Sequence, residues 1–209
     1  SDTNAEVIVV SEGIMPLKIG ENLGVDQDDD HQIHSGEDPH VWFDPNNIMI
    51  WTENISRVLG RIDSPNAESY QANAETYRNE LLELDTWIRE QIELIPPENR
   101  ELVTDHTLLG YFAEEYDFTQ IGAVIPAMTT EAETSGQQLA ELIDIIREHQ
   151  TRAIFVGVDF DPTLIQRVAD ETGVDLISLY FGSLTAGSPA DTYLTFMQYN
   201  VEAIVSALK

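Results

Sequence analysis

The sequence predicts an α/β fold in which a small parallel sheet carries helices on both faces and is preceded by one long helix. After Pro97, short apolar runs alternate with amphipathic stretches, which is typical of parallel sheets covered by helices. Before it, apolar positions recur at helical spacing from Pro65 to Ile95, enough for a helix of about 46 Å at about 1.5 Å per residue. Two histidines, His40 and His106, stand where strand-like or turn segments give way to helices.

The elements before the long helix are predicted from local patterns. Residues 7–10 are apolar and are predicted to form a strand. The polar stretch 22–37, with His31 and His34, is predicted to be a mobile loop. After Asp44, apolar side chains at three- and four-residue steps predict an amphipathic helix, namely Ile48, Trp51, Ile55 and Leu59. Ser64-Pro65 supplies an N-cap and a first-turn proline for the long helix, which Pro96-Pro97 ends.

The C-terminal half alternates between the two kinds of element. Strands are predicted at 101–104, 120–124, 153–156 and 176–179, and helices at 107–116, 135–149, 162–172 and 190–208. Ligand sites on such sheets lie beyond the carboxyl ends of the strands. His106 and the segments 126–130, 157–161 and 180–183 are therefore expected to converge.

The segment from Asp38 to Asn47 holds an imidazole on a stiff connection. Pro39 restricts Asp38 to an extended conformation, and Asp44-Pro45 has the pattern of an N-cap followed by a first-turn proline. His40 lies between these two restraints. Neutral imidazole is a common metal ligand, so His40 and His106, 66 residues apart, are candidate ligands in one shared cleft.

The amino-acid composition excludes several classes of function. The 209 residues are 42% hydrophobic, enough for a substantial core. Ten basic and 38 acidic residues give a formal charge of −28, which opposes binding to nucleic acid. The acidity indicates a solubilising surface rather than a metal site. Without cysteine, a metal must be bound by imidazole, carboxylate or water. No apolar run is long enough for a membrane span, and no signal peptide is recognised.

Several separate motifs, in order, resemble one family: the metal-binding solute-binding proteins of zinc and manganese ABC importers, which include bacterial lipoproteins once called adhesins. The matching segments are Asp38-Pro-His-Val-Trp-Phe-Asp-Pro45, Val103-Thr-Asp-His106, Gly110-Tyr-Phe112, Ile154-Phe-Val156, Ala169-Asp-Glu-Thr-Gly173, Thr192-Tyr-Leu194 and Tyr199-Asn200. The resemblance implies a two-lobed α/β protein with the metal between the lobes. It places the first lobe in 1–63, a linking helix in 64–96 and the second lobe in 97–209.

The resemblance also implies a ligand set. His40 and His106 match two of the family's histidine ligands. The stretch that carries a further ligand histidine in relatives has no counterpart here, so the first lobe is expected to be incomplete and the chain a fragment or processed form. Gly157 and Gly182 occupy positions where relatives carry an acidic ligand, and Asp159 is the nearest stand-in. A histidine-rich site favours Zn²⁺ over the alternative, Mn²⁺.

The function implied is the extracytoplasmic, periplasmic or cell-surface, component of a high-affinity importer. It would capture a divalent metal ion and deliver it to an ABC transporter membrane permease. The chain is expected to be a monomer, although truncation could promote association. Two alternatives remain: an adhesion or binding module with a degenerate cleft, and a zinc-dependent hydrolase. The hydrolase lacks support because no His-Glu-x-x-His or Gly-x-Ser-x-Gly motif is present.

Other polar residues have simpler interpretations. Asp161 is expected to cap the helix that follows it, and His149 to complement the dipole at the end of its helix. Trp42 is expected to pack beneath the site. His31 and His34 are interpreted as part of a solvated loop, or alternatively of a metal-collecting loop. Glu131 and Glu133 follow a segment that lines the cleft in relatives and are interpreted as solvated.

Overall fold

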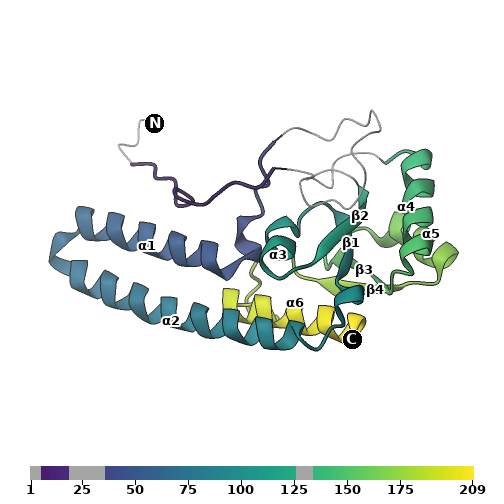
Figure 1. Ribbon diagram of the computed structural model, residues 1–209. Helices are drawn as coiled ribbons and strands as arrows, with labels where there is room; N and C mark the ends of the chain where they lie inside the picture. Colours follow the sequence, from purple (N-terminus) through teal and green to yellow (C-terminus); the bar gives the residue numbers. More distant parts are fainter. Residues whose placement is uncertain (1–5, 19–35, 126–133) are drawn as a thin grey trace. The chain divides into compact units, whose positions relative to one another are not determined.

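A computed structural model describes residues 6–18, 36–125 and 134–209 (Figure 1). Within these ranges the chain divides into two compact units. One contains residues up to 15 together with 44–86, and the other contains 16–43 together with 87–209. Each unit has its own organisation, and the candidate site lies in the second.

The second unit is built on a four-stranded parallel sheet. Its strands are β1 (Glu101–His106), β2 (Thr119–Ile125), β3 (Ala153–Gly157) and β4 (Asp175–Leu179), in the order β2-β1-β3-β4. The connecting helices are α3 (Gly110–Glu115), α4 (Gly136–His149) and α5 (Pro162–Thr172), and α6 (Tyr193–Leu208) follows β4. Figure 1 shows α4 and α5 together on one side of the sheet, with α6 on the other.

The strand order creates a switch point between β1 and β3. The chain leaves β1 toward β2 and then crosses back to β3, so the connections diverge on either side of the β1–β3 pair. Loops that leave the carboxyl ends of such a pair frame a crevice. His106 ends β1 and Gly157 ends β3, so both residues lie at the rim of this crevice.

Apolar side chains on β1, β2 and β3 pack with α4 and α5. This core cluster consists of Val103, Ile121, Val124, Leu142, Ile143, Ile146, Ile154, Val156, Ile165 and Val168. Burial of each large aliphatic side chain stabilises the fold by roughly 1.5–3 kcal/mol before the entropy of ordering is subtracted. The core therefore fixes the strand ends that carry the site residues.

Local signals in the sequence define the helix ends. The Asp161 side chain accepts a 2.9 Å hydrogen bond from the Thr163 backbone N–H and begins α5, confirming its predicted N-cap role. Gly173, at φ +78°, ends the same helix in the left-handed conformation. Ser135 caps α4 in a capping box with Gln138. His149 ends α4, as predicted, where it contacts Glu101.

The first unit contains α1 (Pro45–Ile62), the 3₁₀ helix η2 (Ser64–Asn66) and the start of α2 (Ala67–Ile92). Asp44 caps α1 by accepting a 2.8 Å hydrogen bond from the Asn46 backbone, as its sequence pattern predicts. The expected single helix from Pro65 to Ile95 is wrong at both ends. Residues 64–66 are a 3₁₀ turn, and the α-helix ends at Ile92, giving about 39 Å at about 1.5 Å per residue.

The strand expected at residues 7–10 is absent from the described part of the first unit. Residues 6–9 have no regular structure, and a turn follows over residues 10–13. Asn54 on α1 donates hydrogen bonds to the carbonyls of Val10 and Glu12 at 2.8 and 2.9 Å. An apolar run becomes a strand only where another strand supplies the ladder. Here the Asn54 side chain of α1, and not a neighbouring strand, bonds to these carbonyls.

No helix in the described ranges is both long enough and apolar enough to cross a membrane. The second unit also contains the end of α2 and the 3₁₀ helices η1 (Val41–Phe43) and η3 (Pro97–Asn99).

Candidate metal site

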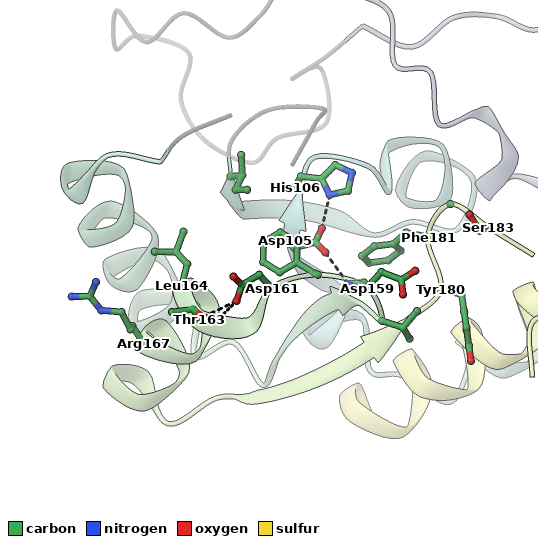
Figure 2. Close-up of a pocket in the computed structure, with 15 residues that line it drawn as sticks. Asp105, His106, Asp159, Asp161, Thr163, Leu164, Arg167, Tyr180, Phe181 and Ser183 are labelled. Atoms are coloured by element: carbon green, nitrogen blue, oxygen red, sulfur yellow. Dashed lines mark hydrogen bonds and ion pairs between the residues drawn. The ribbon is translucent and has the colours of Figure 1, made fainter. Parts of the chain in front are cut away.

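His106 is held at the end of β1 by the residue before it. Its Nδ1 atom lies 2.5 Å from Asp105 Oδ1, and Asp105 is only 1% exposed (Figure 2). Because a carboxylate only accepts hydrogen bonds, Nδ1 carries the proton. The other ring nitrogen, Nε2, is then the one with a free lone pair. A carboxylate behind the ring orients a metal-binding histidine and raises its basicity.

Asp105 also connects the two strands of the switch point. Its second oxygen, Oδ2, accepts a 2.7 Å hydrogen bond from the backbone N–H of Gly157 at the end of β3. Figure 2 shows both interactions as dashed lines from the one carboxylate. Asp105 therefore fixes the His106 ring relative to the sheet.

His40 has the same type of support from a different segment. Its Nδ1 lies 2.7 Å from Asp38 Oδ1, and the same oxygen accepts a 2.8 Å hydrogen bond from the His40 backbone N–H. Both residues are 7% exposed. As at His106, the carboxylate assigns the proton to Nδ1 and leaves Nε2 available.

Two successive hydrogen bonds connect Asp38 to α3 through Leu17. Its backbone N–H donates to the Leu17 carbonyl at 2.9 Å, and the Leu17 N–H donates to the Tyr111 hydroxyl oxygen at 3.1 Å. Burial raises the pKa of Tyr111 above its usual value, while the hydrogen bond from Leu17 acts in the opposite direction. The phenol is thus kept neutral, and α3 is tied to the segment that bears His40.

The two imidazoles lie close together. Their ring centroids are 5.6 Å apart and the rings are inclined at 64°. Imidazole nitrogens bind Zn²⁺ at about 2.0–2.1 Å, so rings at this separation can reach one ion. Both histidines belong to the sheet-containing unit. The pair that the sequence predicts is therefore brought together within one compact unit.

Aromatic side chains border the pair. The Trp42 ring lies edge-on to His40 with centroids 5.3 Å apart, and the Phe181 ring lies edge-on to His106 at 6.2 Å. Trp42 packs beside the site, as predicted. No local sequence pattern indicates the role of Phe181, because its position depends on how the loop after β4 folds back toward β1.

A pocket of about 580 Å³ opens beside His106. It is lined by the ends of β1 and β3, the start of α5 and the loop after β4: Asp105, His106, Ile125, residues 157–161, Thr163, Leu164, Arg167 and residues 180–183. The predicted convergence of 157–161 and 180–183 on His106 is therefore observed. Residues 126–130, the remaining segment of that prediction, lie outside the described ranges.

Asp159 lines this pocket, but its carboxylate does not join the histidine pair. In Figure 2 it points away from His106. Among residues 6–18, 36–125 and 134–209, no three His, Asp or Glu side chains form a group that could hold a metal ion. Ligation by Asp159 stays a prediction. His31, His34, Glu131 and Glu133 lie outside the described residues.

The two glycines at predicted acidic positions differ in their surroundings. A β-carbon at Gly157 would lie 3.2 Å from the Phe181 ring and 3.3 Å from Asp105 Oδ2. A β-carbon at Gly182 would meet no atom within 4 Å. Position 182 can accept a β-carbon without rearrangement, whereas at position 157 the neighbouring atoms must shift slightly.

The second unit is thus an α/β fold in which two aspartate-supported imidazoles lie close together near the carboxyl end of β1. The chain belongs to the family described as ZnuA, zinc-uptake complex component A, periplasmic, whose model matches residues 1–207. The membership confirms the predicted resemblance and the α/β fold. The family comprises extracytoplasmic substrate-binding proteins and not enzymes, as predicted.

Individual relatives carry different metals in their names. The manganese-binding lipoprotein MntA of Halalkalibacterium halodurans is 32% identical over 208 residues, covering 99% of this chain and 65% of the relative. The iron-binding protein YfeA of Yersinia pestis is 33% identical, covering 94% and 60%. A Mn-bound periplasmic metal-binding protein from Candidatus Liberibacter asiaticus has a TM-score of 0.81 at 28% identity, covering 98% and 71%. The chain thus spans less than two thirds of the length of these two curated relatives.

Proposed function

We propose that this chain is the metal-capturing part of the solute-binding component of an ABC importer for a first-row divalent metal ion. The observation that carries the proposal is the pairing of His40 with His106, each supported through Nδ1 by a buried aspartate. A carboxylate behind each ring is the usual support of a metal-ligating histidine. Two imidazoles with this support, one of which lines a pocket, suit ion capture.

Two imidazoles alone do not complete a coordination shell. A four-coordinate ion needs two further ligands. We propose Asp159 as one of them, because it lines the pocket beside His106 and lies on the turn that follows β3. Movement of this turn would be required, because the Asp159 carboxylate points away from His106.

The cargo is proposed to be Zn²⁺, with Mn²⁺ as the alternative. Imidazole suits zinc, and sites with nitrogen ligands bind Zn²⁺ more tightly than Mn²⁺. The names of the relatives MntA and YfeA refer to manganese and iron instead. Intrinsic affinity and transported cargo are separate quantities, because metal availability also decides which ion is loaded.

Delivery to a membrane permease is proposed from the family membership. The organisation into a first lobe at 1–63, a linking helix at 64–96 and a second lobe at 97–209 is likewise a proposal, as is a monomeric state. In this scheme the second lobe supplies His106 and the segment around Asp38 supplies His40. Metal release follows when the permease changes the geometry of these ligands.

Titration calorimetry with Zn²⁺ and Mn²⁺ tests the proposal. The wild-type chain is expected to bind one ion, and the His40→Ala/His106→Ala double variant to lose that binding. His149→Ala is the matched control, because His149 lies on α4 and contacts Glu101 instead of the pair. Equal binding by the wild type and the double variant would contradict the proposal. A higher affinity for Mn²⁺ than for Zn²⁺ would overturn the zinc assignment alone.

A further inference from the structure

Three aromatic residues connect the segment that carries His40 with the loop after β4 and with α6. The Trp42 indole N–H donates a 3.0 Å hydrogen bond to the Phe181 carbonyl, and the Tyr193 hydroxyl donates a 2.9 Å hydrogen bond to the Trp42 carbonyl. We call Trp42, Phe181 and Tyr193 the aromatic bridge. It joins the segment before α1, the loop after β4 and the first residue of α6.

Each end of the aromatic bridge contacts one imidazole. Trp42 follows His40 by two residues, and its ring packs edge-on against it. The Phe181 ring packs edge-on against His106 and also against Phe43, with centroid separations of 6.2 Å in both cases. The hydrogen bond between Trp42 and Phe181 therefore joins the segment that carries His40 to the loop whose Phe181 ring contacts His106.

The loop that carries Phe181 is itself fixed by a buried amide. Asn200 on α6 is 3% exposed, and its side chain donates to the Tyr180 carbonyl at 2.7 Å and accepts from the Tyr180 N–H at 2.9 Å. The Tyr180 backbone therefore has both its N–H and its carbonyl hydrogen-bonded, as it would beside a neighbouring strand. The Phe181 carbonyl is therefore presented to Trp42 from a rigid support.

Helix α6 holds the other side of the bridge. Phe43 packs against Phe196 with ring centroids 5.8 Å apart, and Tyr193 packs against Phe196 at 6.2 Å. Phe43 and Phe196 are 1% and 3% exposed. The segment bearing His40 thus packs on α6 through apolar contact. The hydrogen bond from the Tyr193 hydroxyl fixes where the Trp42 carbonyl lies along α6.

We propose that Trp42 and Tyr193 are positioning residues for the metal site, whose hydrogen bonds set the separation of His40 and His106 before the ion arrives. The proposal rests on the proposed function of this pair. Preorganised ligands bind more tightly because less conformational entropy is lost on binding. The aromatic bridge supplies this order without contacting the ion, since its donors are directed at backbone carbonyls.

The test removes each hydrogen bond while keeping its ring. Trp42→Phe removes the indole N–H, and Tyr193→Phe removes the hydroxyl. Each variant is expected to raise the Kd for Zn²⁺ by about three- to tenfold, as expected for the loss of one hydrogen bond. Tyr199→Phe is the control: it removes a hydroxyl from α6, and among the described residues the contact of Tyr199 is a ring contact with Tyr180.

Two further readouts separate positioning from simple packing. Visible absorption of bound Co²⁺ reports ligand geometry, and the spectrum is expected to change in Trp42→Phe and Tyr193→Phe but not in Tyr199→Phe. Amide hydrogen exchange without metal is expected to accelerate at Val41, Trp42 and Phe181 in Tyr193→Phe. Unchanged Kd values and spectra, with only a lowered Tm, would overturn the proposal.

The outcomes distinguish this inference from the proposed function. If the wild type binds Zn²⁺ and both variants bind it equally well, the aromatic bridge has no positioning role and the proposed function stands. If the wild type binds no metal, the proposed function fails. Hydrogen exchange then tests the aromatic bridge without metal. If residues 41, 42 and 181 exchange as slowly in Tyr193→Phe as in the wild type, the ordering role of the bridge is contradicted.

Discussion

Asp105 and Gly157 are joined by a 2.7 Å hydrogen bond from the Gly157 backbone N–H to Asp105 Oδ2, across the switch point of the sheet. The opposite oxygen of the same carboxylate contacts the ring of His106. One buried side chain thus fixes both the end of β3 and the orientation of a candidate metal ligand.

Asp105→Asn is expected to weaken Zn²⁺ binding by about 10- to 100-fold, the range found when the partner behind a ligating histidine is removed. The amide keeps only one accepting oxygen, so either the Gly157 N–H or the His106 Nδ1–H loses its acceptor. Titration calorimetry measures the affinity, and circular dichroism verifies the fold. An unchanged Kd would show that Asp105 stabilises the sheet through Gly157 but does not support metal binding by His106.

Gly110→Ala is expected to weaken metal binding through Asp38. A β-carbon at position 110 would lie 2.6 Å from Asp38 Oδ2, closer than carbon and oxygen can approach. The carboxylate must move, and the ring of His40 loses its support. Gly136→Ala is the matched control, since a β-carbon there meets nothing within 4 Å. Equal Zn²⁺ affinity in both variants would contradict this role of Asp38.

Gly182→Asp is expected to tighten Mn²⁺ binding more than Zn²⁺ binding. The position has open space for a side chain and lines the pocket beside His106. A carboxylate adds a hard oxygen ligand, which manganese prefers. Gly182→Asn controls for size without charge. The expectation fails if the ratio of the two Kd values is the same in Gly182→Asp and the wild type.

The charge of Asp161 is expected to stabilise the fold only above its folded-state pKa. Hydrogen bonds from the Thr163 side chain and backbone lower the pKa of Asp161. A carboxyl whose folded pKa is depressed contributes stability above its unfolded pKa and loses it as the pH falls through the folded value. Thermal unfolding from about pH 6 to about pH 2 should therefore converge for the wild type and Asp161→Asn. A difference in Tm that grows on acidification would contradict this assignment.

Metal affinity is expected to fall as the pH falls, because imidazolium cannot bind a cation. Calorimetry between about pH 7.5 and about pH 5 measures the change. The His149→Ala variant should show the same dependence as the wild type. Constant affinity across this range would argue against ligation by imidazole.

Local patterns predicted much of this molecule. Alternating apolar runs gave the four strands, and Asp44, Ser135 and Asp161 marked helix starts that the structure confirms. The segment 7–10 failed because strand formation depends on a partner chain segment, which a local pattern does not contain. Propensity alone does not specify pairing.

The candidate site was predictable only in part. His40 stood out because it lies between two proline-restrained segments, and His106 because it follows an apolar strand. Asp38 is only two residues from His40 in the sequence, so its contact with the His40 ring is a local one. The link from Asp105 to Gly157 depends on β1 and β3 being neighbours, and the packing of Phe181 depends on a loop returning to the same edge. These contacts depend on the order of the strands in the sheet, which no local sequence pattern determines.

His40 and His106 are expected to bind one ion together through their Nε2 atoms. Long-range ¹H–¹⁵N spectra of the labelled imidazoles during a Zn²⁺ titration report on each ring nitrogen separately. The Nε2 signals of both residues should shift together and reach their end point at one equivalent of metal, while Nδ1 stays protonated and His149 is unaffected. Metal bound through Nδ1, or two rings that saturate at different metal concentrations, would contradict it.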